Sequence, residues 1–572
     1  MCSNGDTLTS WQTLATAKRE AILGSIPEEW RLAKIPTVEE QRNVTGAYIR
    51  QFLSAKEVEI TETDAMGIVE KTTSGAWRAV EVIQAFCHRA SLSHQLVNCL
   101  HETFFDAALA DAKELDAYFA DHGEPKGPLH GLPVSLKDQF HIKGVETTMG
   151  YVGWIGTFQG QKGDSRSMTF ESEMVRELRQ LGAVLYCKTA VPHTLMCGET
   201  VNNIIEYTWN PHNRNLSCGG SSGGEGALIA LGGSPGGFGT DIGGSIRIPA
   251  AFNGLFGLRP TSGRLPYGGV ANSMDGQNSV LSVVGPLASS AGGVKLLTKS
   301  ILSAEPWLHD PLVTEIPWRR DLEAQTKDLI ASSQLSVGFL DHDGAVAPHP
   351  PVKRALGLLR DLILQSGNKV FEWQPPPHLL QRVNELTYKT WLYDGGADVR
   401  KDFALSGEPW AVQTLDIWQE RPQADASSIA ENNRALRQCR KEYLDYWNST
   451  AASSGTAERH RPADVFVAPC APFAAARPGR YDYIGYTSFV NGLDLPSVVV
   501  PITKVDRTDD VVDTSYQPVS ELDKKIQSDY DPEIYDGAPV SLQIVGRRHQ
   551  EEKLLAIAEW LEGELKKGSL AT

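Results

Sequence analysis

Two serine residues lie within an unusually glycine-rich stretch, residues 219–260. Glycine at that density weakens helices and strands alike, so it is kept where the backbone must approach another group closely or adopt left-handed conformations. Ser221 and Ser245 are flanked by N–H groups that no neighbouring side chain shields. A hydroxyl beside convergent N–H donors is the arrangement of a serine nucleophile with its oxyanion hole. The stretch therefore predicts a hydrolase.

The surroundings of the two serines favour Ser245 as the nucleophile. Residues 219–223 match G-x-S-x-G, the nucleophile elbow of α/β-hydrolases, but that motif requires a preceding strand. The segment that precedes it, NPHNRNLSC, is polar and turn-like. Ser245 instead closes the run GTDIGGS, whose glycines permit several N–H groups to converge on one point. These N–H groups belong to Ile242, Gly243, Gly244 and Ser245.

A serine nucleophile also needs a base. The chain has 14 histidines, none of which lies beside these glycines in a recognisable pattern. A lysine can act as the base when burial keeps it neutral. Lys137 lies in the segment LPVSLKDQF, residues 132–140, which alternates like a strand after a turn. Taken alone, a lysine at the end of a strand is usually a surface residue.

Three further patterns resemble known sites but lack the partners that those sites require. His193, Cys197, His212 and Cys218 do not have the spacing of zinc ligands, so we expect no metal. Cys218 borders the glycine run without an evident histidine partner, which favours a packing role. Residues 366–369 match the S-x-x-K motif of β-lactamases, but its companion motifs are missing.

Composition and charge narrow the class of protein. The chain has 572 residues, of which 41% are hydrophobic and 22% charged, as in a globular protein with an ample core. A net charge of −16 argues against nucleic acid or an anionic membrane as a partner. We see no secretory signal and no apolar run that could span a bilayer, and the 8 cysteines are dispersed. We therefore expect a cytoplasmic protein with reduced thiols.

Alternating strand and helix patterns predict an α/β fold. Apolar and β-branched runs between turn signals predict strands at residues 132–140, 183–189, 335–340, 464–469, 496–502 and 538–546. Apolar residues at helical spacing predict helices at residues 81–87, 104–120, 170–181, 352–363 and 554–561. We therefore predict a central mixed sheet covered by helices on both faces.

Two regions are predicted to lie outside that sheet. Residues 1–60 are rich in charge and are expected to form a helical N-terminal arm on the main body. Residues 376–450, which contain several Trp and Tyr, are expected to form a mainly helical insert. Because strands are predicted on both sides of the insert, residues 61–572 are expected to be a single catalytic domain with one sheet.

Two segments are similar to those of a known family. GGSSGGEGALIALGGSPGGFGTDIGGSIRIPAAF resembles the amidase signature, and LHGLPVSLKD resembles the lysine segment of the same family. The similarity extends over nearly the whole chain to the fungal acetamidases of this family, for example in SIPEEW, ETVNNII, GLRPTSGRLPY, ANSMDGQ and GAPVSLQIVGRR. The resemblance implies the amidase-signature fold and an amidase activity.

The resemblance implies a Ser-Ser-Lys triad. Ser245 matches the family nucleophile, and Lys137 matches the base. Ser221 matches the bridging serine, which in the family follows a cis peptide bond. Ser222 would orient the other two serines through hydrogen bonds.

The resemblance also implies the walls of the site. Asp241 and Arg247 are expected to form an ion pair that holds the nucleophile loop. Residues 272–277 are expected to line the cleft. His193 stands where family members often carry glutamine. The acyl pocket is expected to be lined by Leu195, Met196 and Cys197.

In the implied mechanism, neutral Lys137 accepts a proton from Ser221, Ser221 accepts one from Ser245, and Ser245 attacks the amide carbon to form an acyl-enzyme. The pKa of Lys137 must then lie about 3 units below its ordinary value. No cofactor is required. The family resemblance suggests a homodimer.

Three interpretations of the activity follow. The first is an amidase for small aliphatic carboxamides such as acetamide. The second is a hydrolase of aryl amides such as indole-3-acetamide, or of a secondary-metabolite amide or ester. The third is a non-catalytic or partner-dependent member. The intact Lys, Ser and Ser set argues against a non-catalytic one, and the full-length similarity to stand-alone acetamidases argues against a partner-dependent one.

Overall fold

One large mixed β-sheet forms the centre of the protein. The computed structural model describes residues 10–411, 417–451 and 461–569. Within them, eleven strands form one sheet in the order β1-β3-β2-β6-β8-β7-β12-β13-β11-β9-β10. The strands are β1 (Leu100–Thr103), β2 (Pro133–Lys137), β3 (Val184–Thr189), β6 (Gly236–Asp241), β7 (Phe256–Arg259), β8 (Val283–Ala288), β9 (Ser336–Phe339), β10 (Lys369–Glu372), β11 (Val465–Pro469), β12 (Ser497–Lys504) and β13 (Pro539–Val545).

The sheet has two groups of parallel strands separated by an antiparallel middle, and its edge strand β1 pairs antiparallel with β3. Strands β3, β2 and β6 are parallel neighbours, as are β11, β9 and β10. Strands β6, β8, β7, β12, β13 and β11 pair antiparallel in that order. A separate short ladder joins β4 (Val201–Asn202) to β5 (Glu206–Tyr207). The sheet includes strands from both sides of residues 376–450, as the strand pattern predicts.

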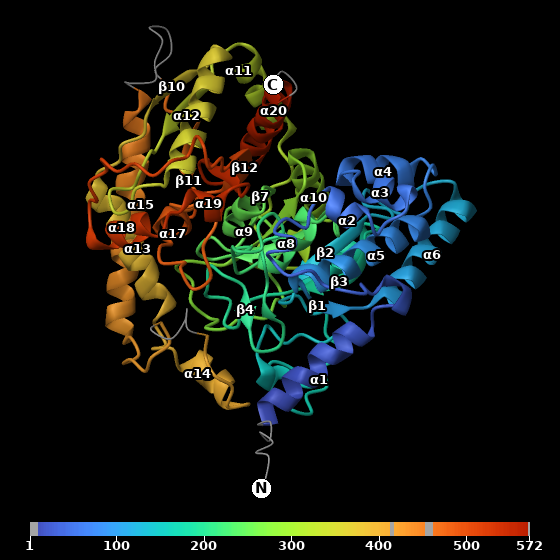
Figure 1. Ribbon diagram of the computed structural model, residues 1–572. Coiled ribbons are helices and arrows are strands. Elements are labelled where there is room, and N and C mark those ends of the chain that lie inside the picture. The colour runs from blue at the N-terminus through green and yellow to red at the C-terminus, as the bar shows by residue number, and fades with distance from the viewer. Residues whose placement is uncertain (1–9, 412–416, 452–460, 570–572) are drawn as a thin grey trace.

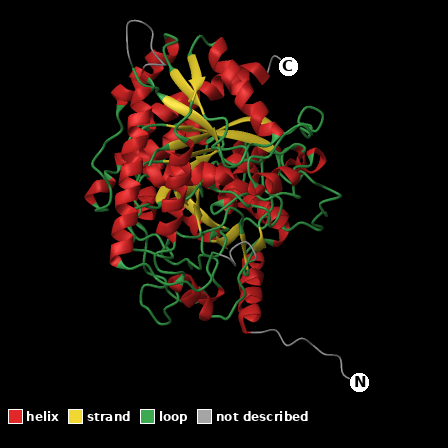
Figure 2. Ribbon diagram, turned by 90° about the vertical axis from the view of Figure 1, so that its left-hand side faces the viewer, coloured by secondary structure: helices red, strands yellow, loops and turns green. Residues whose placement is uncertain are grey.

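Helices cover both faces of the sheet, with the strands running through the middle of the molecule (Figures 1 and 2). The predicted α/β fold is therefore confirmed. The α-helices that start before residue 300 are α1 (Ser10–Gly24), α2 (Ala47–Arg50), α3 (Ala55–Thr61), α4 (Ala65–Thr73), α5 (Ala79–Val97), α6 (Phe105–His122), α7 (Glu173–Gln180), α8 (Gly223–Ala230), α9 (Arg247–Phe252) and α10 (Ala291–Ser303). The later ones are α11 (Arg320–Ala331), α12 (Pro350–Gln365), α13 (Pro377–Trp391), α14 (Ala397–Ala404), α15 (Ala426–Ser449), α17 (Gly485–Leu493), α18 (Glu521–Ser528), α19 (Pro532–Tyr535) and α20 (Glu551–Ser569).

The six predicted strands correspond to β2, β3, β9, β11, β12 and β13. Strand β6 was not predicted, because its sequence GGFGTD lies within the glycine run. Its glycines have a packing role: a Cβ on Gly237 would collide with Ser135 and Glu225, and one on Gly239 would collide with Ser222. The strand therefore brings its backbone close to the neighbouring elements of the site, which a side chain would prevent.

Helices α13, α14 and α15 form the described part of residues 376–450. Helix α13 packs against α15 and α17, and Asn432 of α15 donates a hydrogen bond to the carbonyl of Leu386 at 3.0 Å. Within residues 10–60, the helical elements are α1, α2, most of α3 and a 3-10 turn at Glu28–Trp30, with irregular chain between them. Lys18 of α1 forms ion pairs with Glu102 and Glu146, which tie this helix to the main body.

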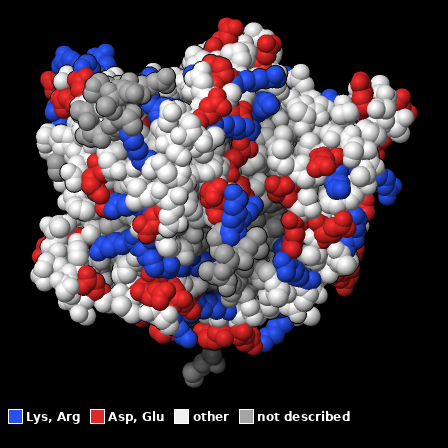
Figure 3. All heavy atoms as spheres, turned by 90° about the horizontal axis from the view of Figure 1, so that it is seen from above, with Lys and Arg blue, Asp and Glu red and all other residues white. Residues whose placement is uncertain are grey.

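The surface charge and the character of the helices can be compared with what binding to nucleic acid or to a membrane would require. On the face seen in Figure 3, acidic and basic side chains are interspersed without an extended basic area. Across the described part of the chain, no helix combines the length and the apolar character that a membrane span needs.

Candidate active site

Lys137 lies at the end of β2 with its side chain completely buried. Its ammonium nitrogen Nζ donates to Ser221 Oγ at 2.8 Å and to Thr240 Oγ1 at 2.7 Å. Burial lowers the pKa of Lys137 from 10.5 to about 7, against the opposing effect of the Asp241 and Glu225 carboxylates. Near neutral pH a large fraction of Lys137 is therefore uncharged, as a general base must be.

Ser221 lies between the glycine turn and helix α8, next to Lys137. The Gly220–Ser221 peptide bond is cis, the geometry that the family resemblance implies for the bridging serine. Like Ser221, Thr240 accepts a hydrogen bond from Lys137, and its hydroxyl donates to Gln139 Oε1 at 2.7 Å. Lys137 thus has two hydroxyl groups as its hydrogen-bond acceptors.

Ser222 contacts the nucleophile loop through the backbone. Its hydroxyl donates to the carbonyl of Thr240 and accepts from the Thr240 N–H, both at 3.4 Å. Its own N–H donates to the carbonyl of Ser245 at 3.1 Å. Ser222 therefore meets Ser245 through its backbone N–H, while its hydroxyl lies against the end of β6, where Gly239 leaves room for it.

Ser245 lies in the loop between β6 and α9, and 8% of its surface is exposed. Its hydroxyl has no hydrogen-bond partner among the described residues, so Oγ can rotate towards either Ser221 or a substrate. Ser245 and Ser221 line the same small cavity. A catalytic hydrogen bond that is absent without substrate often forms only in the complex.

The four N–H groups predicted for the oxyanion hole are not equivalent. The Gly244 N–H donates to Asp241 Oδ1 at 2.8 Å, so it is already occupied. Within the described chain, the N–H groups of Ile242, Gly243 and Ser245 have no partner, and these residues line the cavity. The geometry therefore leaves three donors for an oxyanion. Sequence alone could not reveal that a carboxylate caps the fourth.

A buried ion pair holds this loop. Arg247 donates to both carboxylate oxygens of Asp241 at 3.0 Å, and Asn491 donates to Asp241 Oδ1 at 2.8 Å. Burial alone would raise the pKa of Asp241, but the Arg247 guanidinium outweighs it and the pKa falls to about 2. Arg247 also donates to Gln543 Oε1 at 2.9 Å. The predicted pairing of Asp241 with Arg247 is confirmed.

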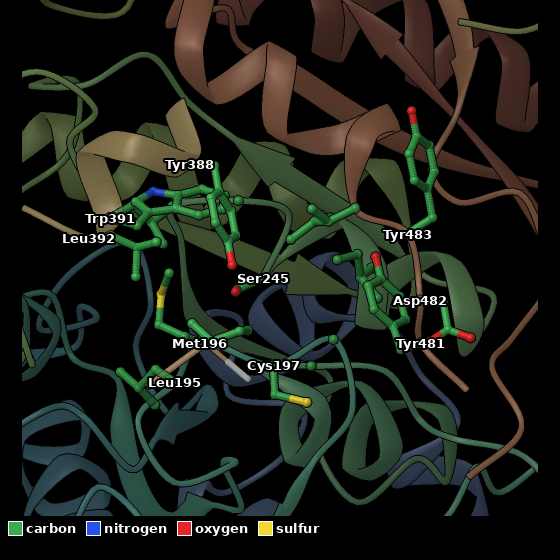
Figure 4. A pocket seen from close by; sticks show the side chains of 17 residues that line it. Leu195, Met196, Cys197, Ser245, Tyr388, Trp391, Leu392, Tyr481, Asp482 and Tyr483 are labelled. Carbon is green, nitrogen blue, oxygen red and sulfur yellow. The ribbon is translucent and has the colours of Figure 1, made fainter. Parts of the chain in front are cut away.

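A cavity of about 190 Å³ opens on one side of Ser245. Figure 4 shows Leu195, Met196 and Cys197 on one wall, and opposite them Tyr388 and Trp391 of helix α13 with Leu392, which follows the helix. The Tyr388 hydroxyl points towards Ser245 (Figure 4). The three wall residues expected from the resemblance therefore border the cavity. The contributions of Tyr388 and Trp391 were not predicted, because no local pattern in residues 376–450 indicates which helix face meets the site.

A second cavity, of about 20 Å³, also borders Ser245, and its lining includes Ser221, Thr240 and Gln139. Asn272, Ser273, Met274 and Gln277 also border it, whereas Asp275 and Gly276 of the same run line an outer cavity instead. This outer cavity, of about 450 Å³, lies beyond Met274 and Trp391. Ser245 therefore borders two spaces of very different size, one of about 190 Å³ and one of about 20 Å³.

The remaining sequence candidates lie apart from this chemistry. His193 accepts a hydrogen bond from the Ala411 N–H at 3.0 Å, and burial lowers its pKa to about 4. Burial raises the pKa of the Cys218 thiol, which disfavours the reactive thiolate. Ser366 ends helix α12. No group of three or more His, Cys, Asp or Glu among the described residues could hold a metal ion.

This geometry can be compared with known proteins. Residues 81–555 match the family model described as Amidase. The chain belongs to the amidase family. It is 46% identical over 560 residues to an acetamidase of Aspergillus oryzae, covering 96% of this chain and 98% of that protein. It is also 44% identical to an acetamidase of Emericella nidulans, with 96% and 97% covered.

A solved structure of a fatty acid amide hydrolase resembles this amidase over most of both chains. The TM-score is 0.87 at 32% identity, and the alignment covers 97% of this chain and 95% of that one. The family and the fold that the sequence predicts are thereby confirmed. The protein is an amide hydrolase of the amidase signature family.

Proposed function

We propose that this amidase hydrolyses a carboxamide to a carboxylate and ammonia through Lys137, Ser221 and Ser245. The observation that carries the proposal is the environment of Lys137, which is fully buried, hydrogen-bonded to Ser221 at 2.8 Å and shifted in pKa to about 7. A buried lysine without a carboxylate in hydrogen-bond contact serves as a base rather than as a fixed charge.

The proposed reaction begins when neutral Lys137 accepts the Ser221 proton and Ser221 accepts the Ser245 proton. Ser245 Oγ then bonds to the amide carbon, and the negative charge on the carbonyl oxygen is stabilised by the N–H groups of Ile242, Gly243 and Ser245. The proton returns through Ser221 to the leaving nitrogen, the carbon–nitrogen bond breaks and ammonia departs. A water molecule, deprotonated along the same route, cleaves the acyl-enzyme ester and restores Ser245.

Small aliphatic amides such as acetamide are the first proposed substrates, because the two relatives named above are acetamidases at 44% and 46% identity. One observation favours the second candidate, an aryl or otherwise larger acyl group. The apolar cavity of about 190 Å³, walled by Trp391 and Tyr388, is far larger than an acetyl group needs. Amides such as indole-3-acetamide, or an ester with a similar acyl group, would fill it.

The test is ammonia release from acetamide, benzamide and indole-3-acetamide by the purified protein, with Ser245→Ala as the inactive control. We expect ammonia from at least one amide, no change in rate with a metal chelator, and none from the Ser245→Ala variant. The order of kcat/KM values decides between the acyl classes. Absence of ammonia from every amide, or a Ser245→Ala variant as active as wild type, would refute the proposal.

A further inference from the structure

Two cavities of different size border Ser245. The cavity of about 190 Å³ is called the large cavity below, and the cavity of about 20 Å³ is called the small cavity. We infer that the small cavity is the leaving-group compartment, that Met274 forms its removable wall, and that this wall restricts the enzyme to primary carboxamides. The inference rests on the proposed function and adds to it the selection between unsubstituted and N-substituted amides.

The position of Ser221 identifies the leaving-group side. In the proposed reaction Ser221 returns the proton to the departing nitrogen, so that nitrogen must lie beside it. Ser221 lines the small cavity, whereas the large cavity is bordered by Ser245 without Ser221. The acyl group therefore extends into the large apolar cavity, and the amide nitrogen faces the small one.

The volume of the small cavity sets what can leave. About 20 Å³ holds a single water-sized molecule, because one water needs at least about 10–15 Å³. Ammonia is of that size, and so is the water that cleaves the acyl-enzyme. The two molecules can occupy this place in succession, since ammonia must depart before water attacks. A methyl group on the amide nitrogen does not fit beside it.

Four side chains separate this compartment from the outer cavity of about 450 Å³: Met274, Gln277, Thr390 and Trp391 line both. Gln277 Oε1 accepts hydrogen bonds from the N–H groups of Ser279 and Val280 at 3.0 Å. Asn432 donates to Thr390 Oγ1 at 3.1 Å. Two of the four side chains are therefore held by hydrogen bonds.

The Trp391 indole ring packs directly against the backbone of Gly243, so closely that a Cβ on Gly243 would come within 2.9 Å of the ring. The Met274 side chain is an unbranched thioether with rotatable bonds. Its backbone φ of +56° lies in the left-handed region that favours glycine. Met274→Gly therefore removes the wall and also relieves the backbone, so the variant is expected to fold.

The experiment compares kcat/KM for benzamide and N-methylbenzamide, measured as ammonia and methylamine release, in wild type, Met274→Gly and Met274→Leu. We expect wild type to prefer benzamide by about 100-fold, the scale on which a pocket rejects one extra carbon. Met274→Gly should narrow that preference by about tenfold or more, and Met274→Leu should keep it. Comparing this ratio between the three proteins cancels the intrinsic difference in reactivity between the two amides.

Two controls separate a specific effect from a general one. Met274 does not line the large cavity, so the acetamide-to-benzamide ratio should stay the same in Met274→Gly. Met168 is 49% exposed, and Met168→Gly should leave all rates unchanged. If Met274→Gly unfolds, as a thermal scan would detect, Met274→Ala replaces it.

The outcomes distinguish the two proposals. A wild type that releases methylamine as readily as ammonia overturns the compartment while leaving the amidase reaction intact. A Met274→Gly variant with an unchanged preference overturns the role of Met274. A wild type that releases ammonia from no primary amide overturns the proposed function, and the compartment falls with it.

Discussion

Replacing Lys137 with methionine tests the buried base directly. The fold lowers the pKa of Lys137 from 10.5 to about 7, which corresponds to on the order of 5 kcal/mol by which the folded state disfavours the ammonium. A methionine side chain at this position would avoid that penalty but lose two hydrogen bonds, to Ser221 and Thr240, worth about 1 kcal/mol each. The Lys137→Met variant should therefore be more stable than wild type near pH 7, by about 3 kcal/mol.

The sign of the pH dependence follows from proton binding. The unfolded chain holds the Lys137 proton up to about pH 10.5, whereas the folded chain releases it near pH 7. Between these values the unfolded state binds more protons, so the stability of wild type rises with pH. The advantage of Lys137→Met should be complete below pH 7. It should disappear at about pH 9, where the remaining penalty equals the contribution of the two lost hydrogen bonds, and wild type should be the more stable protein above that pH.

Activity should change in the opposite direction. Without the base, kcat should fall by about 10²–10⁴-fold, and the wild-type profile of kcat/KM should rise with pH through an apparent pKa near 7. Urea unfolding from pH 6 to 9 measures the stability difference, and ammonia release measures the activity. Turnover at the wild-type rate in Lys137→Met, or a stability difference that does not vary with pH, would refute the reasoning.

Three further substitutions test the surroundings of the base and the nucleophile. Asp241→Asn leaves the buried Arg247 without its carboxylate and should cost about 3–5 kcal/mol of unfolding free energy. The control, Asp445→Asn at the exposed Lys441–Asp445 pair, should cost less than about 1 kcal/mol. Equal losses in urea unfolding would argue against a special role for the Asp241–Arg247 pair. Glu225→Gln removes a carboxylate that raises the pKa of Lys137, so the acid limb of the kcat/KM profile should move to lower pH, and a limb that stays in place or moves up contradicts this. Gly244→Ala would place a Cβ 2.5 Å from Thr487 Oγ1 at a backbone φ of +136°, and the resulting displacement of the oxyanion donors should lower kcat by about 10²–10³-fold. The control is Gly357→Ala, at an exposed glycine whose added Cβ would meet open space. Full activity in Gly244→Ala would show that the loop has more room than the structure gives it.

The sequence predicts those parts of the fold whose signals are local. Strand β11 is a continuous apolar run and β3 begins with one, and α7 has buried Met174 and Leu178 at helical spacing before Gly182. Strand β6 lacks that signal, because close approach to Ser222 and Glu225 selects glycine at the expense of strand propensity. Local propensity is therefore least informative where the backbone itself forms the site.

In the candidate site as well, some features could be predicted from the sequence and others depend on the tertiary structure. Lys137 and Ser221 are 84 residues apart in the chain, and only the family resemblance brings them together before the structure is known. The occupied Gly244 N–H and the aromatic wall of Tyr388 and Trp391 depend on which tertiary neighbours meet the loop. No spacing within the sequence encodes such neighbours.

Two buried lysines on adjacent strands differ in their hydrogen-bond partners. Lys188 of β3 is fully buried beside Asp138, with Nζ 2.6 Å from the carboxylate, and this contact holds the pKa of Asp138 below its usual range in spite of its burial. Lys137 of β2 is equally buried, but its hydrogen-bond acceptors are the hydroxyls of Ser221 and Thr240. A carboxylate partner stabilises the ammonium, whereas hydroxyl partners leave desolvation largely uncompensated. The proposed neutral base therefore depends on the hydrogen-bond partners of Lys137 as much as on its burial, and a carboxylate in place of either hydroxyl would favour the charged ammonium form of Lys137.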